Sequence, residues 1–309
     1  MIYTVTLNPA IDKTAVISGF RAGTLNRIES LREDVGGKGI NVSRCLLALG
    51  EKSTAAVILA GGAGRKCREY LEGAGIGVLC EEVPGETRTN LKIADPLRGE
   101  NTDINEPGPE VPAEVLECLK ERIAEKLCPG DIVILSGSLP RGADKGLYAA
   151  WCARFSACGA RVILDADGEA LRLGLKEKPW LIKPNHEELA ALADVDAKDP
   201  DALLRAGDAL RKAGVGRVVI SRGGEGAIFL TEEGNCSAAP LSVPVKSTVG
   251  AGDSMVAALA FAAERGLGAE ETVRLSMAMG AASVMLPGTD APDVECVRRL
   301  CGEVRINLA

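Results

Sequence analysis

The sequence predicts an α/β protein with a parallel sheet between two layers of helices and a smaller β-sheet beside it. From residue 113 onwards, short apolar strands alternate with helix-period segments, which is the pattern of βαβ units. Before residue 105, several strand-like segments have no helix to accompany them, which predicts a separate small sheet. The chain has 309 residues, of which 46% are hydrophobic, so it is long enough to bury one large core.

The N-terminal third contributes to both sheets. Residues 2–7 alternate and predict a first strand that ends at Asn8-Pro9, with Asp12 on the loop that follows. The segments expected in the small sheet are residues 14–20, 28–34, 89–94 and 102–105. The main sheet would receive strands 55–60 and 78–82, with helices at 42–49 and 63–74.

The remaining two thirds have a regular rhythm. Strands are expected at 131–135, 161–164, 180–182 and 217–220, followed by a hairpin of 225–231 and 235–241 with its turn at Glu233-Gly234. Helices are expected at 113–126, 145–157, shortly after 164, at 186–192, at 200–213, and three times between 250 and 300. The sequence contains no linker or repeat, so we expect residues 1–309 to form one domain, with the small sheet made by segments near 12–34 and 88–105.

Charge and composition exclude several classes of protein. A net charge of −7 argues against nucleic acid or an anionic membrane as the main partner. No signal-peptide pattern or membrane-length apolar run is visible, so we expect a cytoplasmic protein. The ten cysteines include no C-x-x-C pair and are expected to be reduced thiols. His186 is the only histidine, which excludes a His-rich metal site.

The segment 245–264 is the strongest candidate for chemistry, because a loop with Gly250 and Gly252 leads directly into an apolar helix. The start of a helix offers free N–H groups and the positive end of a dipole, which together suit phosphate oxygens. Asp253 lies in the first turn of this helix. It could simply complement the dipole, or it could accept a proton from an attacking hydroxyl group; the segment alone leaves both interpretations open.

Other polar and glycine residues also follow predicted strands, at the sheet edge where α/β proteins bind ligands. They are Asn8 and Asp12, Gly36–Gly39 with Asn41, Ser136–Ser138, Lys183–Asn185 with Glu188, Ser221–Gly224, and Gly250–Asp253. Each has a structural alternative. The Gly36–Gly39 run could be a tight turn, Asn185 and Glu188 match a capping box, and Arg88 could be a solvated charge.

Two rival nucleotide motifs match less well. Gly61-Gly-Ala-Gly64 begins like a dinucleotide fingerprint, but its third glycine is replaced by Cys67. A P-loop is absent, because Gly37-Lys38 is followed by glycine rather than by serine or threonine.

Several of these motifs together resemble the PfkB, or ribokinase-like, family of carbohydrate kinases over essentially the whole chain. Ser247-Thr-Val-Gly-Ala-Gly-Asp253 and Gly36-Gly-Lys-Gly-Ile-Asn-Val-Ser43 resemble the two signatures of the family. The runs Thr87–Lys92 and Thr102–Pro109 resemble its phosphosugar branch, and Lys38 most resembles the members that act on fructose 1-phosphate. The resemblance implies a ribokinase-like three-layer αβα domain with a small β-sheet lid.

The resemblance also implies roles for individual residues, with MgATP as donor and a ketohexose phosphate as acceptor. Asp253 would be the general base, and Gly250, Ala251 and Gly252 would form the anion hole. The substrate side would comprise Asp12, Gly36, Gly37, Lys38, Asn41, Arg88, Ser138 and Arg27, with Arg88 and Lys38 facing the existing phosphate group. The nucleotide side would comprise Lys183, Asn185, Glu188, Ser221, Gly223, Gly224, Gly226 and Thr248, with Glu188 acting on Mg²⁺ through water.

The expected reaction transfers the γ-phosphoryl group of ATP to the 6-hydroxyl group of fructose 1-phosphate. Tagatose 6-phosphate and fructose 6-phosphate remain alternative acceptors, and a sugar-phosphate sensor without activity is the alternative from a different class. In relatives the lid forms a dimer clasp, so we expect a homodimer in which Arg27 serves the neighbouring site. A requirement for K⁺ is left open. Asp167 departs from the family pattern, which has a small hydroxylated residue there.

Overall fold

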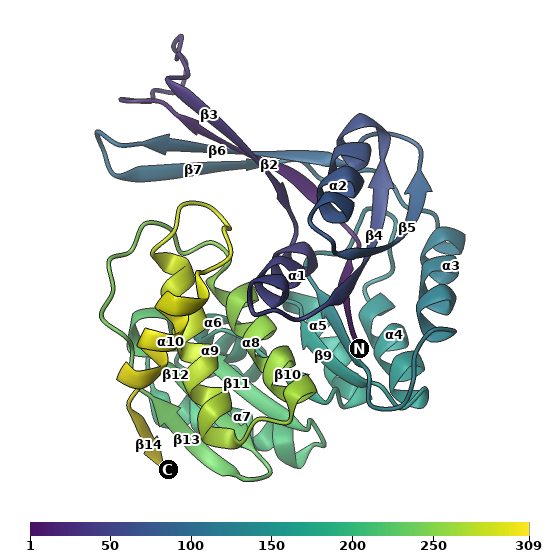
Figure 1. Ribbon diagram of the computed structural model, residues 1–309, viewed down its shortest axis with the longest axis vertical. Helices are drawn as coiled ribbons and strands as arrows, with labels where there is room; N and C mark the ends of the chain where they lie inside the picture. The colour runs from purple at the N-terminus through teal and green to yellow at the C-terminus, as the bar shows by residue number, and fades with distance from the viewer. Residues whose placement is uncertain (309) are drawn as a thin grey trace.

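The computed structural model describes residues 1–308, and a ten-stranded sheet forms its centre (Figure 1). Its strands are apolar on both faces, as expected of strands that are covered by helices on both sides. The order across the sheet is β14-β13-β12-β11-β10-β9-β8-β1-β4-β5. The strands are β1 (Ile2–Thr6), β4 (Ser53–Ala60), β5 (Gly77–Val83), β8 (Ile132–Ser136), β9 (Arg161–Asp165), β10 (Leu181–Ile182), β11 (Arg217–Ser221), β12 (Ala227–Thr231), β13 (Gly234–Ala238) and β14 (Ile306–Leu308).

Helices cover both faces of this sheet. One layer consists of α1 (Lys38–Ala48), α2 (Gly61–Gly73), α8 (Ala251–Arg265), α9 (Ala269–Val284) and α10 (Val294–Glu303). The other consists of α3 (Ala113–Ala124), α4 (Leu147–Ala157), α5 (Gly168–Gly174), α6 (His186–Ala193) and α7 (Pro200–Lys212). Alternate residues of β1 serve the two cores, since Tyr3 and Val5 pack with the second layer and Ile2 with the first. The predicted three-layer αβα class is therefore confirmed.

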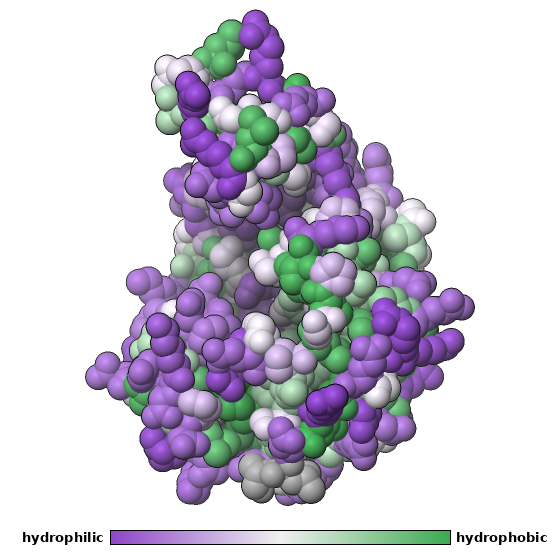
Figure 2. Space-filling view, turned by 90° about the vertical axis from the view of Figure 1, so that its left-hand side faces the viewer, coloured by the Kyte–Doolittle hydropathy of each residue, from purple (hydrophilic) through white to green (hydrophobic). Residues whose placement is uncertain are grey.

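A four-stranded sheet overhangs the body of the molecule (Figures 1 and 2). Its order is β3-β2-β6-β7, formed by β3 (Ser30–Gly36), β2 (Ala10–Val16), β6 (Arg88–Asp95) and β7 (Glu100–Asn105). The β2–β6 pair is parallel and the other two pairs are antiparallel. The prediction of a small sheet is confirmed, but its first two strands were placed wrongly. Asp12 lies inside β2 rather than on a loop, because the break at Asn8-Pro9 is short and the strand resumes at Ala10.

Three further boundaries differ from the prediction. Helix α1 begins at Lys38 rather than at residue 42, since Gly37 adopts a φ of 125° and turns the chain directly into the helix. Strand β13 ends at Ala238 rather than at residue 241. The chain then returns at its C-terminal end to add β14 antiparallel to β13, a three-residue edge strand too short to give a sequence signal.

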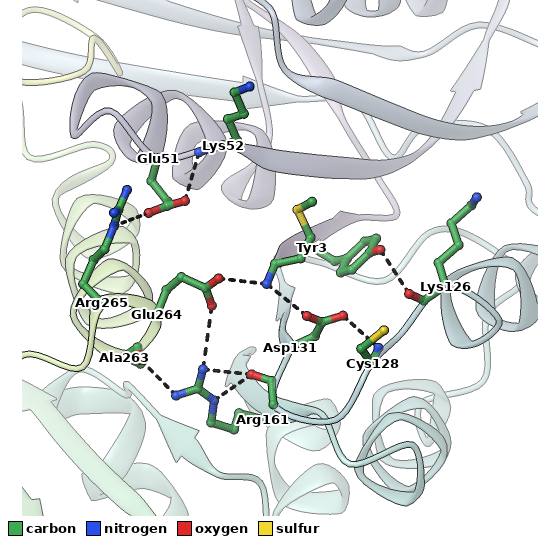
Figure 3. Close-up of polar contacts among 12 residues, drawn as sticks. Tyr3, Glu51, Lys52, Lys126, Cys128, Asp131, Arg161, Ala263, Glu264 and Arg265 are labelled. Atoms are coloured by element: carbon green, nitrogen blue, oxygen red, sulfur yellow. Dashed lines mark hydrogen bonds and ion pairs between the residues drawn. The ribbon is translucent and has the colours of Figure 1, made fainter.

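A charged network marks the end of the main sheet where β1, β8 and β9 begin (Figure 3). The Met1 ammonium group donates to Asp131 at 2.9 Å and to Glu264, near the end of α8, at 2.8 Å. Arg161 at the start of β9 donates to the Ala263 carbonyl group at 3.0 Å. These contacts tie the C-terminal end of α8 to the amino ends of three parallel strands. The N-terminal end of α8 therefore lies at the carboxyl ends of the strands, where α/β proteins bind ligands. Within residues 1–308, no helix is long and apolar enough to cross a membrane.

Candidate active site

A cavity with a volume of about 980 Å³ opens at the carboxyl ends of the parallel strands. It is lined by most of the residues singled out in the sequence, namely Gly37, Lys38, Asn41, Arg88, Ser138, Lys183, Asn185, Glu188, Ser221, Gly223, Gly224, Gly226, Thr248, Gly250, Ala251, Gly252 and Asp253. Asp12, Gly36 and Arg27 do not line it. Asp12 instead lines a smaller cavity of about 250 Å³ beside the small sheet. The two cavities share Asn90, Asn105 and Val249.

The first turn of α8 forms the floor of this cavity. Gly250 precedes the helix with a φ of 82°, a left-handed conformation that favours glycine. A methyl group added to Gly252 would lie 3.1 Å from Nζ of Lys183, so this ammonium group lies directly against the helix start. Free N–H groups, the helix dipole and a cation thus converge on one spot, which suits phosphate oxygens.

Asp253 is 6% exposed and accepts a hydrogen bond of 2.7 Å from Nδ2 of Asn41 at its Oδ2 atom. Burial and the nearby Asp165 charge raise the pKa of Asp253 to about 6, against the opposing effects of Asn41, Lys38 and Lys183. A carboxylate with this pKa is ionised at neutral pH and still basic enough to accept a proton from a hydroxyl group. The geometry therefore allows Asp253 to act as a base beside the phosphate-binding helix start.

Asp165 ends β9 and pairs with two lysines inside the cavity. Its Oδ2 atom lies 3.4 Å from Nζ of Lys38 and its Oδ1 atom 3.4 Å from Nζ of Lys183. Burial alone would raise the pKa of Asp165, but Lys183 and Lys38 hold it below its ordinary value. The Asp165 charge in turn raises the pKa of Lys38, so this carboxylate and this ammonium group both remain charged. Sequence reasoning missed Asp165, although it stands at a strand end, where the other candidates were found.

Arg88 and Asp12 extend the site towards the small sheet. Arg88 donates from Nη1 to the Glu106 carbonyl group at 3.3 Å, and its buried Nε atom has no hydrogen-bond partner among residues 1–308. Burial lowers the pKa of Arg88, although its guanidinium group remains charged. Asp12 accepts a hydrogen bond of 2.8 Å from Nδ2 of Asn90. A side chain at Gly36 would collide with the Asp12 carboxylate, since an added methyl group would lie 1.9 Å from Oδ2.

The lining of the cavity also includes the start of a capped helix and a set of apolar side chains, which we call the apolar wall. Asn185 caps α6 by accepting from the Glu188 N–H group at 2.8 Å, and Glu188 accepts from the Asn185 N–H group at 2.9 Å. The expected capping box is therefore present, and Glu188 still lines the cavity. The apolar wall, which would suit a flat aromatic ring, was not predicted and consists of Leu241, Val243, Met277, Ala281 and Val284.

The residues present fit a divalent metal ion that arrives together with phosphate groups. In the part of the chain that the structure describes, no three His, Cys, Asp or Glu side chains are grouped to hold a metal ion. Glu188 nevertheless lines the cavity, whereas the two carboxylate oxygens of Asp165 lie against Nζ of Lys38 and Nζ of Lys183. A metal that keeps several waters and binds phosphate oxygens needs only one or two carboxylates from the protein.

Two residues of the sequence analysis have less prominent positions. Asp167 precedes α5 and lines the cavity, but it makes no ion pair with any described residue. Arg27 is exposed on the turn between β2 and β3 and does not line the cavity of its own chain.

Sequence reasoning also missed Asn90 and Arg44. Asn90 follows Arg88 at the strand period of two, and Arg44 follows Asn41 by three residues on the same face of α1, so both periodicities carried a usable signal.

Together, a doubly covered parallel sheet, a helix start that suits phosphate oxygens and a buried carboxylate point to a phosphotransferase without a P-loop. The family model described as "pfkB family carbohydrate kinase" matches residues 5–296. The chain belongs to this family of carbohydrate kinases. The predicted resemblance and the predicted class of enzyme, an ATP-dependent sugar kinase, are thereby confirmed.

Individual relatives agree with this assignment. The 1-phosphofructokinase of Rhodobacter capsulatus is 37% identical over 99% of this chain and 97% of its own length. The structure of phosphofructokinase-2 from Escherichia coli in complex with potassium aligns with a TM-score of 0.92 and 30% identity, covering 98% of both chains. A tetrameric inhibited form of the same Escherichia coli protein aligns with a TM-score of 0.90 at 30% identity, again over 98% of both chains.

Proposed function

We propose that this protein is a 1-phosphofructokinase, which transfers the γ-phosphoryl group of MgATP to the 6-hydroxyl group of fructose 1-phosphate. The observation that carries the proposal is the position of Asp253, a buried carboxylate of raised pKa in the first turn of α8, beside the ammonium group of Lys183. The acceptor is proposed from similarity, because relatives such as the one from Rhodobacter capsulatus are 1-phosphofructokinases.

In the proposed mechanism, the proton of the sugar's 6-hydroxyl group moves to Asp253 as its oxygen bonds to the γ-phosphorus atom. The bond from that phosphorus to the bridging oxygen breaks, and ADP leaves with the electron pair. The N–H groups at Gly250, Ala251 and Gly252 and the charge of Lys183 would stabilise the transferring group. Bound Mg²⁺ would neutralise phosphate charge, with Glu188 as its protein ligand through water.

The two substrates would lie at opposite ends of the cavity. We assign the sugar's own phosphate group to Arg88, Lys38 and Ser138, because Arg88 has an unpartnered Nε atom that a phosphate oxygen can use. Asp12 and Asn41 suit sugar hydroxyl groups, with Gly36 and Gly37 allowing close approach. ATP would occupy the end formed by Lys183, Asn185, Ser221, Gly223, Gly224, Gly226 and Thr248, with its purine ring on the apolar wall.

We further propose a homodimer that forms through the small sheet. Exposed apolar side chains gather on this sheet and its turns, among them Leu25, Ile28, Leu31, Leu97 and Ile104. Figure 2 shows green patches among the purple side chains of this overhanging sheet. A second copy would cover them and bring its Arg27 towards the neighbouring cavity. Light scattering should then give the mass of a dimer, and Ile104→Asp should shift it towards the monomer; a tetramer, as in the Escherichia coli relative, is the competing result.

The test of the reaction is ADP release by the purified protein with MgATP. Fructose 1-phosphate, fructose 6-phosphate and tagatose 6-phosphate are compared by kcat/KM, with Mg²⁺ omitted in one control and K⁺ replaced by Na⁺ in another. We expect a clear preference for fructose 1-phosphate and no turnover without Mg²⁺. Preference for another phosphosugar would overturn the acceptor but keep the mechanism. Binding without any turnover would instead identify a sugar-phosphate sensor.

We also propose that the protein is located in the cytoplasm. The ten free thiols fit this reducing compartment.

A further inference from the structure

Arg44 is a buried cation that forms no ion pair with a carboxylate of the described residues. It is 8% exposed, and its guanidinium group lies over the ring of Tyr70, with 5.8 Å between Cζ and the ring centroid. Its Nη2 atom donates to Oδ1 of Asn41 and, at 2.7 Å, to Oγ1 of Thr289. Its Nε atom has no partner among the described residues. Burying a charge without an ion-pair partner is costly, so this arrangement needs a reason beyond packing.

The contact with Asn41 fixes the direction of an amide group. An asparagine side chain has an acceptor oxygen at one end and a donor NH₂ group at the other. Because Arg44 can only donate, the Asn41 oxygen must face Arg44 and the Asn41 NH₂ group must face away from it. That NH₂ group donates to Oδ2 of Asp253 at 2.7 Å. Rotation of the amide by half a turn would place its oxygen against the Asp253 carboxylate, which repels it unless Asp253 is protonated.

We propose that Arg44 is a positioning residue for the phosphoryl transfer, because it orients Asn41 to hold Asp253 in its ionised form. This inference rests on the proposed function, in which Asp253 accepts the proton. Arg44 touches neither substrate nor the reacting atoms, since it does not line the cavity. Arg44 can therefore affect the reaction by two routes, one through Asn41 and one through the loop that carries Thr289.

The Thr289 contact links the same residue to the helix start and to the small sheet. The methyl group of Thr289 would lie 3.4 Å from a side-chain carbon added at Gly250. The next residue, Asp290, forms an ion pair with Arg32 of β3. Loss of the Thr289 contact would thus disturb the floor of the cavity but leave the Asn41 amide held by Arg44. Thr289→Val therefore separates the two routes.

The pH dependence of kcat/KM distinguishes positioning from a structural role. Besides Asn41, the groups around Asp253 that carry or gain charge are Asp165 from β9, Lys183 after β10, and Lys38 and Cys45 from α1. The acidic limb is the fall in kcat/KM at low pH, where Asp253 becomes protonated. In Arg44→Met this limb should move upwards by about one pH unit, since the Asn41 NH₂ group that donates to Asp253 is no longer held in place. Activity should then fall about threefold at pH 6.5 and about tenfold below pH 5, and it should recover above pH 8.5. Arg44→Lys, which retains a charged donor, should restore most of the activity.

Asn41→Ala provides the second variant, so that the test survives if Arg44→Met does not fold. It should move the acidic limb in the same direction, and the double variant should move it no further than the larger single change. Thr289→Val should leave the limb in place. The matched control is Arg122→Met, which removes a partly buried arginine from α3 and should leave the whole pH profile unchanged.

The outcomes test the proposed function and the role of Arg44 separately. If the wild-type protein turns over none of the three phosphosugars, the proposed function fails before any variant is made. If the wild-type protein is active and Arg44→Met loses activity equally at every pH, or Asn41→Ala leaves the acidic limb at its wild-type pH, Arg44 is only structural and the inference is overturned. Full activity of Arg44→Met would overturn it as well.

Discussion

Lys183 and Asp165 form an ion pair of 3.4 Å between Nζ and Oδ1, although both side chains are buried. Lys38 contacts the other carboxylate oxygen at the same distance. One carboxylate therefore holds a lysine from the proposed sugar side and a lysine from the proposed nucleotide side. The Asp165 carboxylate therefore fixes the positions of both ammonium groups before either substrate binds.

Replacing Asp165 by Asn should be costly in two separate ways. The buried ammonium group of Lys183 and the partly exposed one of Lys38 would lose their partner. Breaking a buried pair costs about 3 kcal/mol or more of the free energy of unfolding. The acidic limb of kcat/KM should also move to lower pH, because the Asp165 charge raises the pKa of Asp253. This is the opposite direction to the shift expected for Arg44→Met.

Asp167→Asn is the matched control, since it removes a carboxylate from the same cavity that makes no ion pair. Urea denaturation and pH profiles of the two variants should differ clearly. An equal loss of stability in both would show that the lysine pairing of Asp165 contributes nothing.

The unaltered protein should lose activity as the pH falls through about 6, the pKa that burial and Asp165 give to Asp253. A base must be ionised to accept a proton, so kcat/KM should fall tenfold per pH unit below that value. An unperturbed aspartate would place this limb near pH 4. Rates measured between pH 4.5 and 8, with MgATP saturating, distinguish the two positions; a limb at 4 would contradict the assigned environment of Asp253.

The components of the site could be predicted, whereas their pairing could not. Gly250, Gly252 and Asp253 were singled out because a glycine loop that enters an apolar helix suits phosphate oxygens, although the segment alone left a purely structural interpretation open. Parallel topology then gathers the residues that follow each strand. The bond between Asn41 and Asp253 joins residues 212 positions apart, so only the packing of α1 on α8 reveals it. Arg44 stands three residues after Asn41, a usable helical spacing, but only the structure shows that it donates to the Asn41 oxygen.

The small sheet shows a second limit of sequence reasoning. Its existence was predicted from strand-like segments without helices, yet β2 was placed four residues too late and Asp12 was assigned to a loop. Strands of this kind are partly exposed on both faces, so hydrophobic alternation determines their register only weakly. The central strands of the main sheet, from β1 and β4 through β8 to β11, are largely buried and were placed to within about two residues.

Asp253→Asn should abolish most activity and stabilise the fold. The loss of kcat should be about 10³-fold, within the range expected for removing a general base. Because the folded pKa of about 6 lies above the value of 3.8 expected without burial, ionised Asp253 costs stability above pH 6. The variant should therefore gain on the order of 2 kcal/mol at pH 8, and the gain should disappear as the pH falls from 6 towards 4. Thermal unfolding at pH 8 and at pH 4.5 measures this; a variant less stable than the wild type at pH 8 would contradict it.

Arg88→Ala should weaken the binding of the phosphosugar and spare the nucleotide. A charge-assisted contact with phosphate is worth roughly 2 to 3 kcal/mol, so the KM of the sugar should rise about 30- to 100-fold. The KM of ATP should stay within twofold. Arg68→Ala removes an arginine that pairs with Glu82 on the surface and serves as the control. Equal changes in both KM values would remove Arg88 from the phosphate site.

Gly252→Ala tests how closely Lys183 approaches the helix start. The added methyl group would lie 3.1 Å from Nζ of Lys183 and must displace it by a few tenths of an ångström. Since Gly252 lies within α8, where alanine favours helix formation, we expect the free energy of unfolding to change by less than about 1 kcal/mol. The kcat value should nevertheless fall at least tenfold, because both the N–H groups and the cation face the transferring phosphoryl group. Gly250→Ala is the contrasting variant, since its φ of 82° makes any side chain there strained and should lower stability by about 1 kcal/mol or more. Unchanged kcat in a stable Gly252→Ala protein would show that the ammonium group of Lys183 does not act at the transferring phosphoryl group.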